Sequence, residues 1–559
     1  METPTSQQPP GVRRAGYDNR VILLILWLIA GLLLVGFNGR VPLERTQEAR
    51  VLQTAREMLG GDFREWLIPH LNGRIRLEKP PLAYWLTATS YHFFGTTVWA
   101  GRLPMALIGC FTLALTYAFA RRLFNSRTAL FSAAALLSSL LFNRYRSLAE
   151  TDIPVTFFVT AAIFFIYLAW DRDADAPAEP NLAASSSYPY HHLAAVAIAL
   201  AILAKGPPGL FPLLFLLALA ATTRRWRLLS GFLLCGASLT LLAIAIPWFI
   251  FVGQSPESAV IKTEASMLLT GFGHKRPFWF YLAEVLPTAT LPWIGFLILA
   301  FIAAIPQFKS SLSLRTVLLW ILIIFLPLTC IGQKQDHYFL PLMPPLMILV
   351  GYLLDRAISA ADVRLTRGTA LILFCTALVA LLATPAPLIA AHELRGHITP
   401  IDIAFSALLL ITSATVLLIH HRKGLPLSTP ALLAAACLLI PITFALWAPT
   451  LQKTTRLDLA RQIQSAFPNH PYAFWQAESL TLSYHLGRPV PLYTEAPELA
   501  DALRKQPNLI VIFDKGKKKD QPAPPGMSEQ MRIPADRDMI AVYRLTSPTS
   551  PATQPSAPQ

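Results

Sequence analysis

The stretch that decides the fold class is residues 152–170, which read DIPVTFFVTAAIFFIYLAW. After Asp152 this stretch has no charged residue, and as a helix rising about 1.5 Å per residue it nearly matches the roughly 30 Å core of a bilayer. About thirteen stretches of this kind occur along the chain and predict an all-α polytopic membrane protein. They are residues 21–37, 99–120, 128–143, 152–170, 191–204, 207–221, 229–252, 281–305, 315–331, 338–354, 369–391, 401–419 and 428–448.

The composition agrees with a membrane protein. Hydrophobic residues make up 54% of the 559 residues and charged residues only 14%, against roughly 25% charged in soluble domains. A soluble globule, a disordered chain and a coiled coil are therefore excluded. The net charge of +15 is typical of proteins with basic cytoplasmic loops, so we expect membrane lipids, and no nucleic acid, as partners.

The distribution of basic residues predicts the orientation of the chain. If residues 1–20 lie in the cytoplasm, every predicted cytoplasmic loop carries at least one Lys or Arg, as the positive-inside rule requires. The transmembrane domain then covers residues 21–449 and includes a first extracytoplasmic loop at 38–98. We expect the chemistry on the outer face of the membrane.

A small soluble domain is predicted after the last span. Residues 450–547 are mixed in composition, and Val/Ile-rich strands at 508–514 and 539–545 indicate an extracytoplasmic α/β domain. The Ser/Pro/Thr-rich tail at 548–559 is expected to be disordered.

The first extracytoplasmic loop has a high density of charged side chains. Apolar residues recur with helical spacing around Glu48, Arg50 and Arg56, which predicts an amphipathic helix lying flat at the membrane surface. Glu78 and Lys79 then precede two prolines that fix a charged turn. Any one of these residues is accounted for equally well by a solvated helix face, but together they suggest an anionic ligand.

Further charged residues are predicted on the same side of the membrane. Asp152 opens one span, where capping of the helix and a functional role are compatible. Lys205, Arg276, Lys334 and His337 lie at the outer ends of other spans, where such residues also serve as simple anchors. With the lysine of the first loop they would form a cationic rim that faces two or three carboxylates.

A rim of this kind suits the transfer of a group from a phosphate leaving group. Cations stabilise the negative charge that develops on the phosphate, and a carboxylate accepts the proton of an incoming hydroxyl. Glu48 and Asp152 are the candidate catalytic carboxylates, and a groove between spans would hold a lipid tail. The sequence itself calls for no metal and no cofactor: the Asp171–Asp173 pair, which has metal-motif spacing, lies in a predicted cytoplasmic linker.

Short motifs in the first 350 residues match a known pattern in their order. They are Gln47-Glu48-Ala49-Arg50, Pro69-His70-Leu71-Asn72-Gly73, Glu78-Lys79-Pro80-Pro81, Asp152-Ile153-Pro154, Lys205-Gly206-Pro207 and His337-Tyr338-Phe339-Leu340-Pro341. The chain thereby resembles bacterial aminoarabinose transferases, glycosyltransferases of the protein O-mannosyltransferase superfamily with the GT-C fold. The resemblance implies an inner-membrane enzyme that moves a sugar from a polyprenyl-phosphate donor to lipid A or another envelope glycan or protein, usually with inversion. It also implies that Lys79 binds phosphate and that Tyr338 contacts the donor.

One position departs from the pattern of that family. Its first-loop acidic pair usually reads Asp-Glu, with the first residue as the presumed catalytic acid, whereas this chain has Gln47 before Glu48. Three possibilities remain open: Glu48 or Asp152 replaces the missing acid, an anionic acceptor needs no base, or the chain is a non-catalytic glycan-binding relative. A transporter or lipid flippase would place ionisable residues within spans and show internal repeats, but the charges cluster at span ends.

Overall fold

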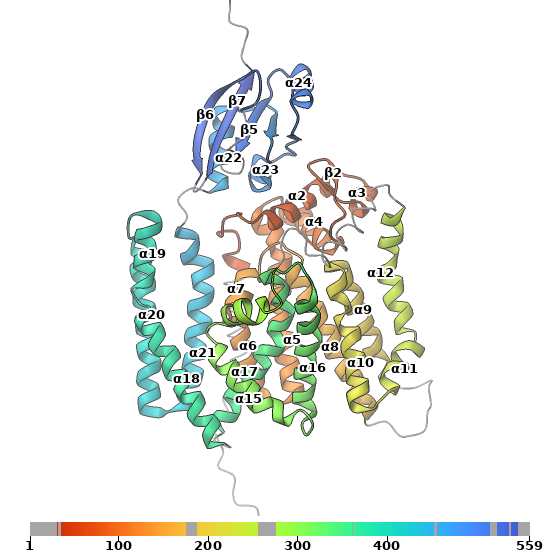
Figure 1. The fold of residues 1–559 in the computed structure, drawn as a ribbon, viewed down its shortest axis with the longest axis vertical. Helices are drawn as coiled ribbons and strands as arrows, with labels where there is room; N and C mark the ends of the chain where they lie inside the picture. Colours follow the sequence, from red (N-terminus) through yellow and green to blue (C-terminus); the bar gives the residue numbers. More distant parts are fainter. Residues whose placement is uncertain are drawn as a thin grey trace, which may run out of the picture.

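The computed structural model describes residues 31, 35–174, 187–254, 276–359, 362–451, 455–514, 523–535 and 538–545. Figure 1 shows a body of long helices, a layer of short elements above it, and a sheet domain at the top. The predicted segment 1–20, most of the first predicted span at 21–37 and the tail at 548–559 lie outside the described residues.

Seven helices among the described residues are long and apolar enough to cross a membrane. They are α5 (Val98–Leu123), α8 (Asp152–Ala174), α16 (Leu312–Cys330), α17 (Met343–Ile358, after the 3-10 turn η6, Asp336–Leu342), α18 (Val363–Leu382), α20 (Pro400–Lys423) and α21 (Leu425–Ile442, continued by η7, Thr443–Trp447, and η8, Ala448–Leu451). Two bent pairs could each form one more span. They are α11 (Arg227–Leu234) with α12 (Ala237–Gly253), bent by 57°, and Tyr281–Ala289 (η4, Tyr281–Val285, and α14, Leu286–Ala289) with Ile294–Gln307 (α15, Ile294–Ala304, and η5, Ile305–Gln307), bent by 116°.

The other helices of the body are shorter or less apolar. They are α6 (Ser126–Leu137), α7 (Leu140–Tyr145), α9 (Tyr188–Lys205), η2 (Pro207–Leu210), α10 (Phe211–Thr223) and α19 (Ala386–Arg395). Every predicted span within the described residues coincides with one or more helices, which confirms the all-α polytopic class. The number thirteen stays a prediction, because helices such as α6 and α10 are too short to cross alone.

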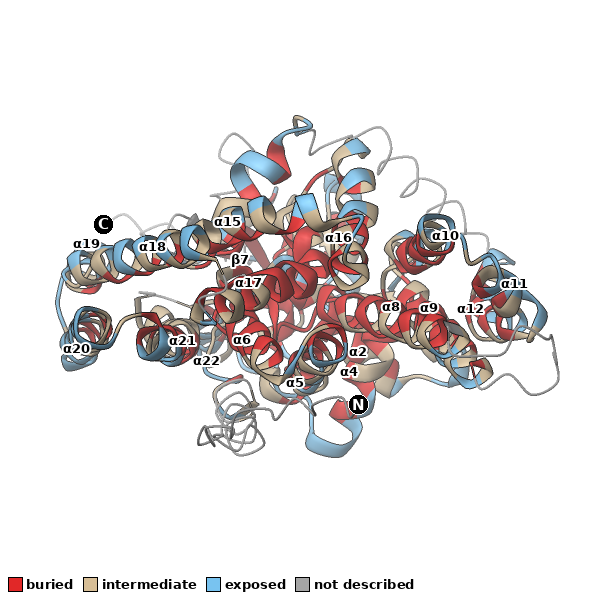
Figure 2. Cartoon of the chain, turned by 90° about the horizontal axis from the view of Figure 1, so that it is seen from below, coloured by how far each residue is buried: buried red, intermediate tan, exposed pale blue. Residues whose placement is uncertain are grey.

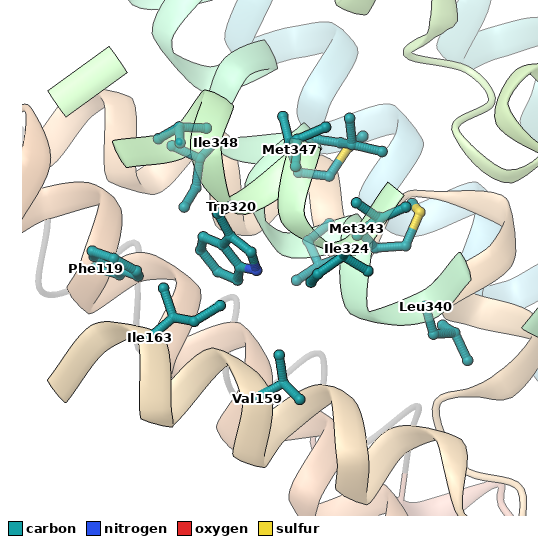
Figure 3. Packing of buried hydrophobic residues seen from close by; sticks show 14 of the residues in the cluster. Phe119, Val159, Ile163, Trp320, Ile324, Leu340, Met343, Met347 and Ile348 are labelled. Carbon is teal, nitrogen blue, oxygen red and sulfur yellow. The ribbon is translucent and has the colours of Figure 1, made fainter. Parts of the chain in front are cut away.

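The body has an enclosed centre and, at one edge, helices whose apolar faces are exposed. In each span we compare the most apolar 18-residue stretch. The buried share of that stretch is 89% in the η6–α17 span and 72% in α8, against 22% in α18 and in α20. Figure 3 shows the centre, where Trp320 of α16 stacks on Phe119 of α5 with 5.4 Å between ring centroids. Figure 2 shows α18, α20 and α21 standing at one side with exposed faces. Exposed apolar faces carry little cost beside lipid tails, which are as apolar as leucine.

The short elements above the body belong to the predicted first extracytoplasmic loop. They are α2 (Thr46–Gly60), α3 (Phe63–Leu67), β1 (His70–Leu71), β2 (Arg74–Ile75) and α4 (Leu82–Phe94). As predicted, α2 is amphipathic and buries Val51, Leu52 and Met58. The β1–β2 hairpin turns at Asn72 and Gly73, which both have positive φ, because an Asn-Gly pair tolerates the left-handed conformation that a two-residue hairpin needs.

A five-stranded sheet forms the small C-terminal domain. Its elements are α22 (Arg456–Ala466), β3 (Tyr472–Trp475), α23 (Leu480–Leu486), β4 (Leu492–Tyr493), α24 (Ala496–Lys505), β5 (Ile510–Asp514), β6 (Met527–Ala535) and β7 (Asp538–Leu545). The order is β4-β3-β5-β7-β6, with β4, β3 and β5 parallel and β7 and β6 antiparallel. The α/β character and the two predicted strands, which appear as β5 and β7, are confirmed.

The C-terminal domain rests on the layer that contains α2 and α4. The Tyr484 hydroxyl of α23 lies 2.9 Å from that of Tyr91 in α4, and its carbonyl accepts a 2.8 Å hydrogen bond from Arg56 of α2. The Arg56 guanidinium also lies 4.0 Å from the centre of the Tyr484 ring. The α2 helix therefore contacts the C-terminal domain through Arg56, while the rest of its surface faces other parts of the molecule.

Candidate functional site

A polar pocket lies where the layer of short elements meets the helical body; we call it the central pocket. It has about 730 Å³ of empty volume, including the part open to solvent. Its walls come from α2, from the segment after β2, from the starts of α8 and η6 and from the end of α9. The lining residues are Gln47, Arg50, Val51, Arg76, Glu78, Lys79, Tyr84, Glu150, Thr151, Asp152, Lys205, Gln333, Gln335, His337 and Tyr338.

An ion pair between Asp152 and Lys205 forms one wall of the central pocket. Both side chains are more than nine-tenths buried, and the Lys205 ammonium also lies 4.4 Å from the centre of the Tyr338 ring. Asp152 is the first residue of α8 and Lys205 the last of α9. The α9 helix ends there because Gly206 has φ +75° and Pro207 follows, a combination that stops a helix. The two helices thus bring together two residues 53 positions apart.

Glu150 lies beside this pair and is held by a residue of the first loop. Its carboxylate accepts a 2.7 Å hydrogen bond from Arg45 Nε. Burial raises the pKa of Glu150, and the neighbouring Arg45 charge opposes that effect without cancelling it. Arg45 also stacks on Tyr145, with 4.8 Å from the guanidinium carbon to the ring centre, so the carboxylate has a fixed orientation.

A second wall of the central pocket is mainly cationic. Arg76 forms a 3.0 Å ion pair with Glu78 and donates a 3.2 Å hydrogen bond to the Tyr84 hydroxyl. Burial and then the like charge of Arg76 lower the pKa of Arg50, whose guanidinium donates a 3.3 Å hydrogen bond to Gln47. Together with Lys79, which also lines the pocket, these two guanidinium groups outnumber the Glu78 carboxylate on this wall, which favours an anionic ligand.

His337 and its neighbour Asp336 close the side of the pocket formed by η6. The Asp336 carboxylate accepts hydrogen bonds of 2.9 Å from Tyr145, from Arg144 and from the backbone N–H of His337. The His337 ring packs between the Tyr145 and Tyr338 rings, with centroid distances of 5.6 and 4.9 Å. These contacts hold His337 and Tyr338 at the edge of the pocket.

Glu48, expected to be catalytic, lies outside the central pocket. Its side chain is 1% exposed and accepts two 2.7 Å hydrogen bonds from Arg102 of α5 and one of 2.9 Å from the backbone N–H of Ala149. Arg102 also donates to the carbonyls of Asn38 and Val41. In this geometry the Glu48 carboxylate holds α2 against α5 and lies away from the charged residues of the central pocket.

Three predicted binding residues also lie away from the pocket. Arg56 contacts Tyr484 at the C-terminal domain. Lys334 is buried and donates hydrogen bonds to the carbonyls of Ile331 and Arg276. The Arg276 guanidinium lies over the Phe280 ring at 5.5 Å. By contrast, the pocket brings together the other predicted residues, Arg50, Glu78, Lys79, Asp152, Lys205, His337 and Tyr338.

Two charged residues of the pocket were not predicted. Glu150 stands two residues before Asp152, and Arg76 two residues before Glu78. In an extended segment, residues i and i+2 point to the same side, which could have indicated both. No three His, Cys, Asp or Glu side chains come together as a metal site among the residues that the structure describes.

The chain is similar to several known proteins in sequence. Residues 78–251, which include Glu78, Lys79, Glu150, Asp152 and Lys205, match the family model of the dolichyl-phosphate-mannose-protein mannosyltransferases. An uncharacterised protein of Aquifex aeolicus is 28% identical over 369 residues, 64% of this chain and 68% of that protein. An undecaprenyl phosphate-alpha-4-amino-4-deoxy-L-arabinose arabinosyl transferase of Pseudomonas paraeruginosa is 28% identical over 379 residues, 65% of this chain and 64% of its own length. The chain thus covers slightly less than two thirds of that transferase.

The fold is similar to that of solved structures. The crystal structure of ArnT from Cupriavidus metallidurans bound to undecaprenyl phosphate superimposes with a TM-score of 0.72 and 21% identity, covering 96% of this chain and 100% of that one. The archaeal oligosaccharyltransferase AglB from Archaeoglobus fulgidus gives a TM-score of 0.51 at 13% identity, over 89% of this chain and 69% of that one. These likenesses confirm the predicted resemblance to ArnT-like proteins and the GT-C type of fold.

Proposed function

We propose that this ArnT-like membrane protein is a glycosyltransferase of the inner membrane that moves a sugar from a polyprenyl-phosphate donor to an extracytoplasmic acceptor. The observation that carries the proposal is the central pocket itself. It places Lys79, Arg50 and Lys205 beside the carboxylates of Glu150 and Asp152, at the ends of membrane-spanning helices. A donor with a phosphate in the pocket and a polyprenyl tail along the helices fits this combination of charge and location.

The cations would act on the leaving group. An acceptor oxygen attacks C1 of the sugar, the bond between C1 and the phosphate oxygen breaks, and the bonding electrons stay on the phosphate. Lys79 and Arg50 would stabilise that charge from the cationic wall, since charge-assisted hydrogen bonds to a developing anion lower the barrier most where water is excluded. Tyr338, whose ring lies against the Lys205 ammonium, would contact the donor.

Asp152 is the proposed acceptor-side carboxylate. A hydroxyl acceptor loses a proton during attack, and Asp152 would receive it while Lys205 keeps the carboxylate charged and oriented. Gln47 at the exposed rim cannot accept a proton, so a hydroxyl acceptor depends on Asp152, whereas an acceptor that is already an anion, such as a phosphate of lipid A or of another envelope glycan, would need no base. The position of Gln47 also makes a non-catalytic glycan-binding relative the second candidate.

The extracytoplasmic placement of the pocket is part of the proposal. Basic residues gather at the ends of the helices opposite the pocket, among them Arg121 and Arg122 at the end of α5 and Arg422 and Lys423 at the end of α20. The positive-inside rule assigns that end to the cytoplasm. The central pocket and the C-terminal domain, at the other end (Figure 1), would then face the periplasm.

The proposal is tested by transfer in proteoliposomes. Purified protein is supplied with a pool of polyprenyl-phosphate sugars and an envelope lipid extract, and products are followed by mass spectrometry. We expect a sugar mass added to an acceptor, lost in Lys79→Ala and Asp152→Asn and kept in Lys505→Ala, an exposed control on α24. If the folded wild type binds the donor but forms no product with any acceptor, catalysis is refuted in favour of glycan binding.

A further inference from the structure

A second cavity lies apart from the central pocket, between the segment that follows α7 and the outer end of α21. It has about 360 Å³ of empty volume. Asn38 contributes from one side, residues 143–144 and 146–148 from another, and Phe444 and Ala445 of η7 from the third. Figure 2 shows α21 between α6 and the exposed helix α20, and α21 also contacts α7. Of the described residues that line this junction cavity, none is Asp or Glu.

Arg146 brings a charge into the junction cavity. It is 2% exposed, and its Nε and Nη1 atoms are buried without a hydrogen-bond partner among the described residues. Besides burial, the neighbouring Cys110 thiol influences the protonation of the Arg146 guanidinium. This thiol is neutral near pH 7, so it provides no counter-ion. A guanidinium remains charged in a protein, and a buried charge without a partner is strongly unfavourable.

Two amides add unused hydrogen-bonding capacity. Both side-chain atoms of Asn38 and the Oδ1 atom of Asn143 are buried without a partner within the described part of the chain. Native proteins satisfy nearly all such groups. The backbone of Arg146 is also fixed, because a Cβ on Gly109 of α5 would lie 2.8 Å from the Arg146 carbonyl oxygen, so the two segments pack in direct contact. Several orphaned groups around one cavity indicate a ligand that satisfies them together.

The surroundings of the cavity favour a lipid as the ligand. Phe37, Val41, Leu148 and Phe444 contribute apolar surface to the same cavity. The neighbouring α20 exposes apolar side chains such as Ile411, which is 62% exposed. Acyl chains would cover such a surface, and the phosphate of the same molecule would meet the guanidinium and the amide. A free anion would leave the apolar walls uncovered.

We propose that the junction cavity binds the phosphate of an anionic membrane lipid through Arg146 and Asn38, at a site distinct from the central pocket. The lipid belongs to the leaflet on the side of the central pocket, because Arg146 stands six residues before Asp152, the residue that opens α8. It fills the junction cavity and so contacts both η7, at the outer end of α21, and the segment that follows α7. This inference does not depend on the transfer reaction.

The test compares lipids with and without a phosphate. Protein depleted of lipid in detergent is titrated with phosphatidylglycerol, diacylglycerol or inorganic phosphate, while native mass spectrometry measures binding and a melting curve measures stability. We expect phosphatidylglycerol to bind and to raise the melting temperature. Arg146→Gln should weaken that binding roughly tenfold or more, as expected for a lost charged hydrogen bond. Arg364→Gln, which removes an exposed charge from α18, should leave it unchanged.

Two further variants locate the bound lipid in the junction cavity. Ala445→Leu narrows the cavity without changing a charge and should also weaken binding. Lys79→Ala should leave the Arg146-dependent binding in place, because that lysine belongs to the central pocket. In lipid-free detergent, Arg146→Gln should melt at or above the wild-type temperature, since an unpaired buried charge has been removed.

Three results would overturn the proposal. The first is wild-type affinity for phosphatidylglycerol in Arg146→Gln. The second is a melting temperature of Arg146→Gln that lies below that of the wild type by the same amount with and without lipid, which would mean that Arg146 has a protein partner. The third is equal stabilisation by inorganic phosphate alone, which would replace the lipid by a free anion.

Discussion

Replacement of Glu48 by Gln tests whether this residue supports the fold or takes part in the reaction. The Glu48 carboxylate and the Arg102 guanidinium are each 1% exposed and share two hydrogen bonds of 2.7 Å. Each charge-assisted bond contributes about 1.5–3 kcal/mol, and breaking a buried pair by removing one partner costs about 3–5 kcal/mol. We therefore expect Glu48→Gln to lose about 3–5 kcal/mol of stability.

The measurement is thermal unfolding in detergent, followed by the transfer assay on the fraction that remains folded. A second variant, Glu48→Gln with Arg102→Met, removes the stranded guanidinium and should recover much of the stability, because apolar replacement of a buried pair is often neutral. We expect this double variant to regain transfer as well. A Glu48→Gln protein that melts like wild type but transfers no sugar would refute this reasoning and restore the catalytic role.

Three further predictions concern other contacts. Lys205→Met should destabilise the protein by about 3–5 kcal/mol, and adding Asp152→Asn should recover stability without recovering transfer; recovery of both would contradict the proposed role of the pair. Arg56→Met should weaken docking of the C-terminal domain by about 2 kcal/mol, seen as faster hydrogen exchange around Tyr484, and unchanged exchange there would count against this contact. Burial, followed by the charges of Arg56 and Arg102, lowers the pKa of His485 from 6.5 to about 4. Because the unfolded chain then binds a proton that the folded chain does not, stability should fall by about 2 kcal/mol from pH 7 to pH 5; melting curves of His485→Gln should lack that component, and an identical pH profile would disprove it.

The membrane-spanning body could be predicted from the sequence because apolar runs of the right length have few alternatives in a bilayer. The amphipathic character of α2 was equally readable from the spacing of its apolar residues. The 116° bend between Tyr281–Ala289 and Ile294–Gln307 was not predicted, although Pro292 lies in the break and a proline interrupts a helix.

The site was predicted only in part, because the sequence does not record how the helices pack against one another. Gln47 and Glu48 are separated by about 100° around a helix, and which of them faces the pocket depends on how α2 rolls against α5. Glu48 turned inward to Arg102, while Gln47 stayed at the rim. Arg276 and Lys334 were grouped with the pocket because they share its predicted side of the membrane. A shared side fixes the depth of a residue and leaves its position within the membrane plane undetermined.

The Asp152–Lys205 pair joins the beginning of one helix to the end of another. The start of α8 carries the partial positive charge of aligned peptide dipoles, and the end of α9 carries the partial negative charge. Asp152 and Lys205 each complement the helix end on which they stand, so the helices favour this arrangement of charges before the two side chains meet. Exchange of the residues, with Lys at 152 and Asp at 205, would keep the ion pair but place both charges against their own helices. The polarity of this part of the central pocket is therefore built into the direction of its helices.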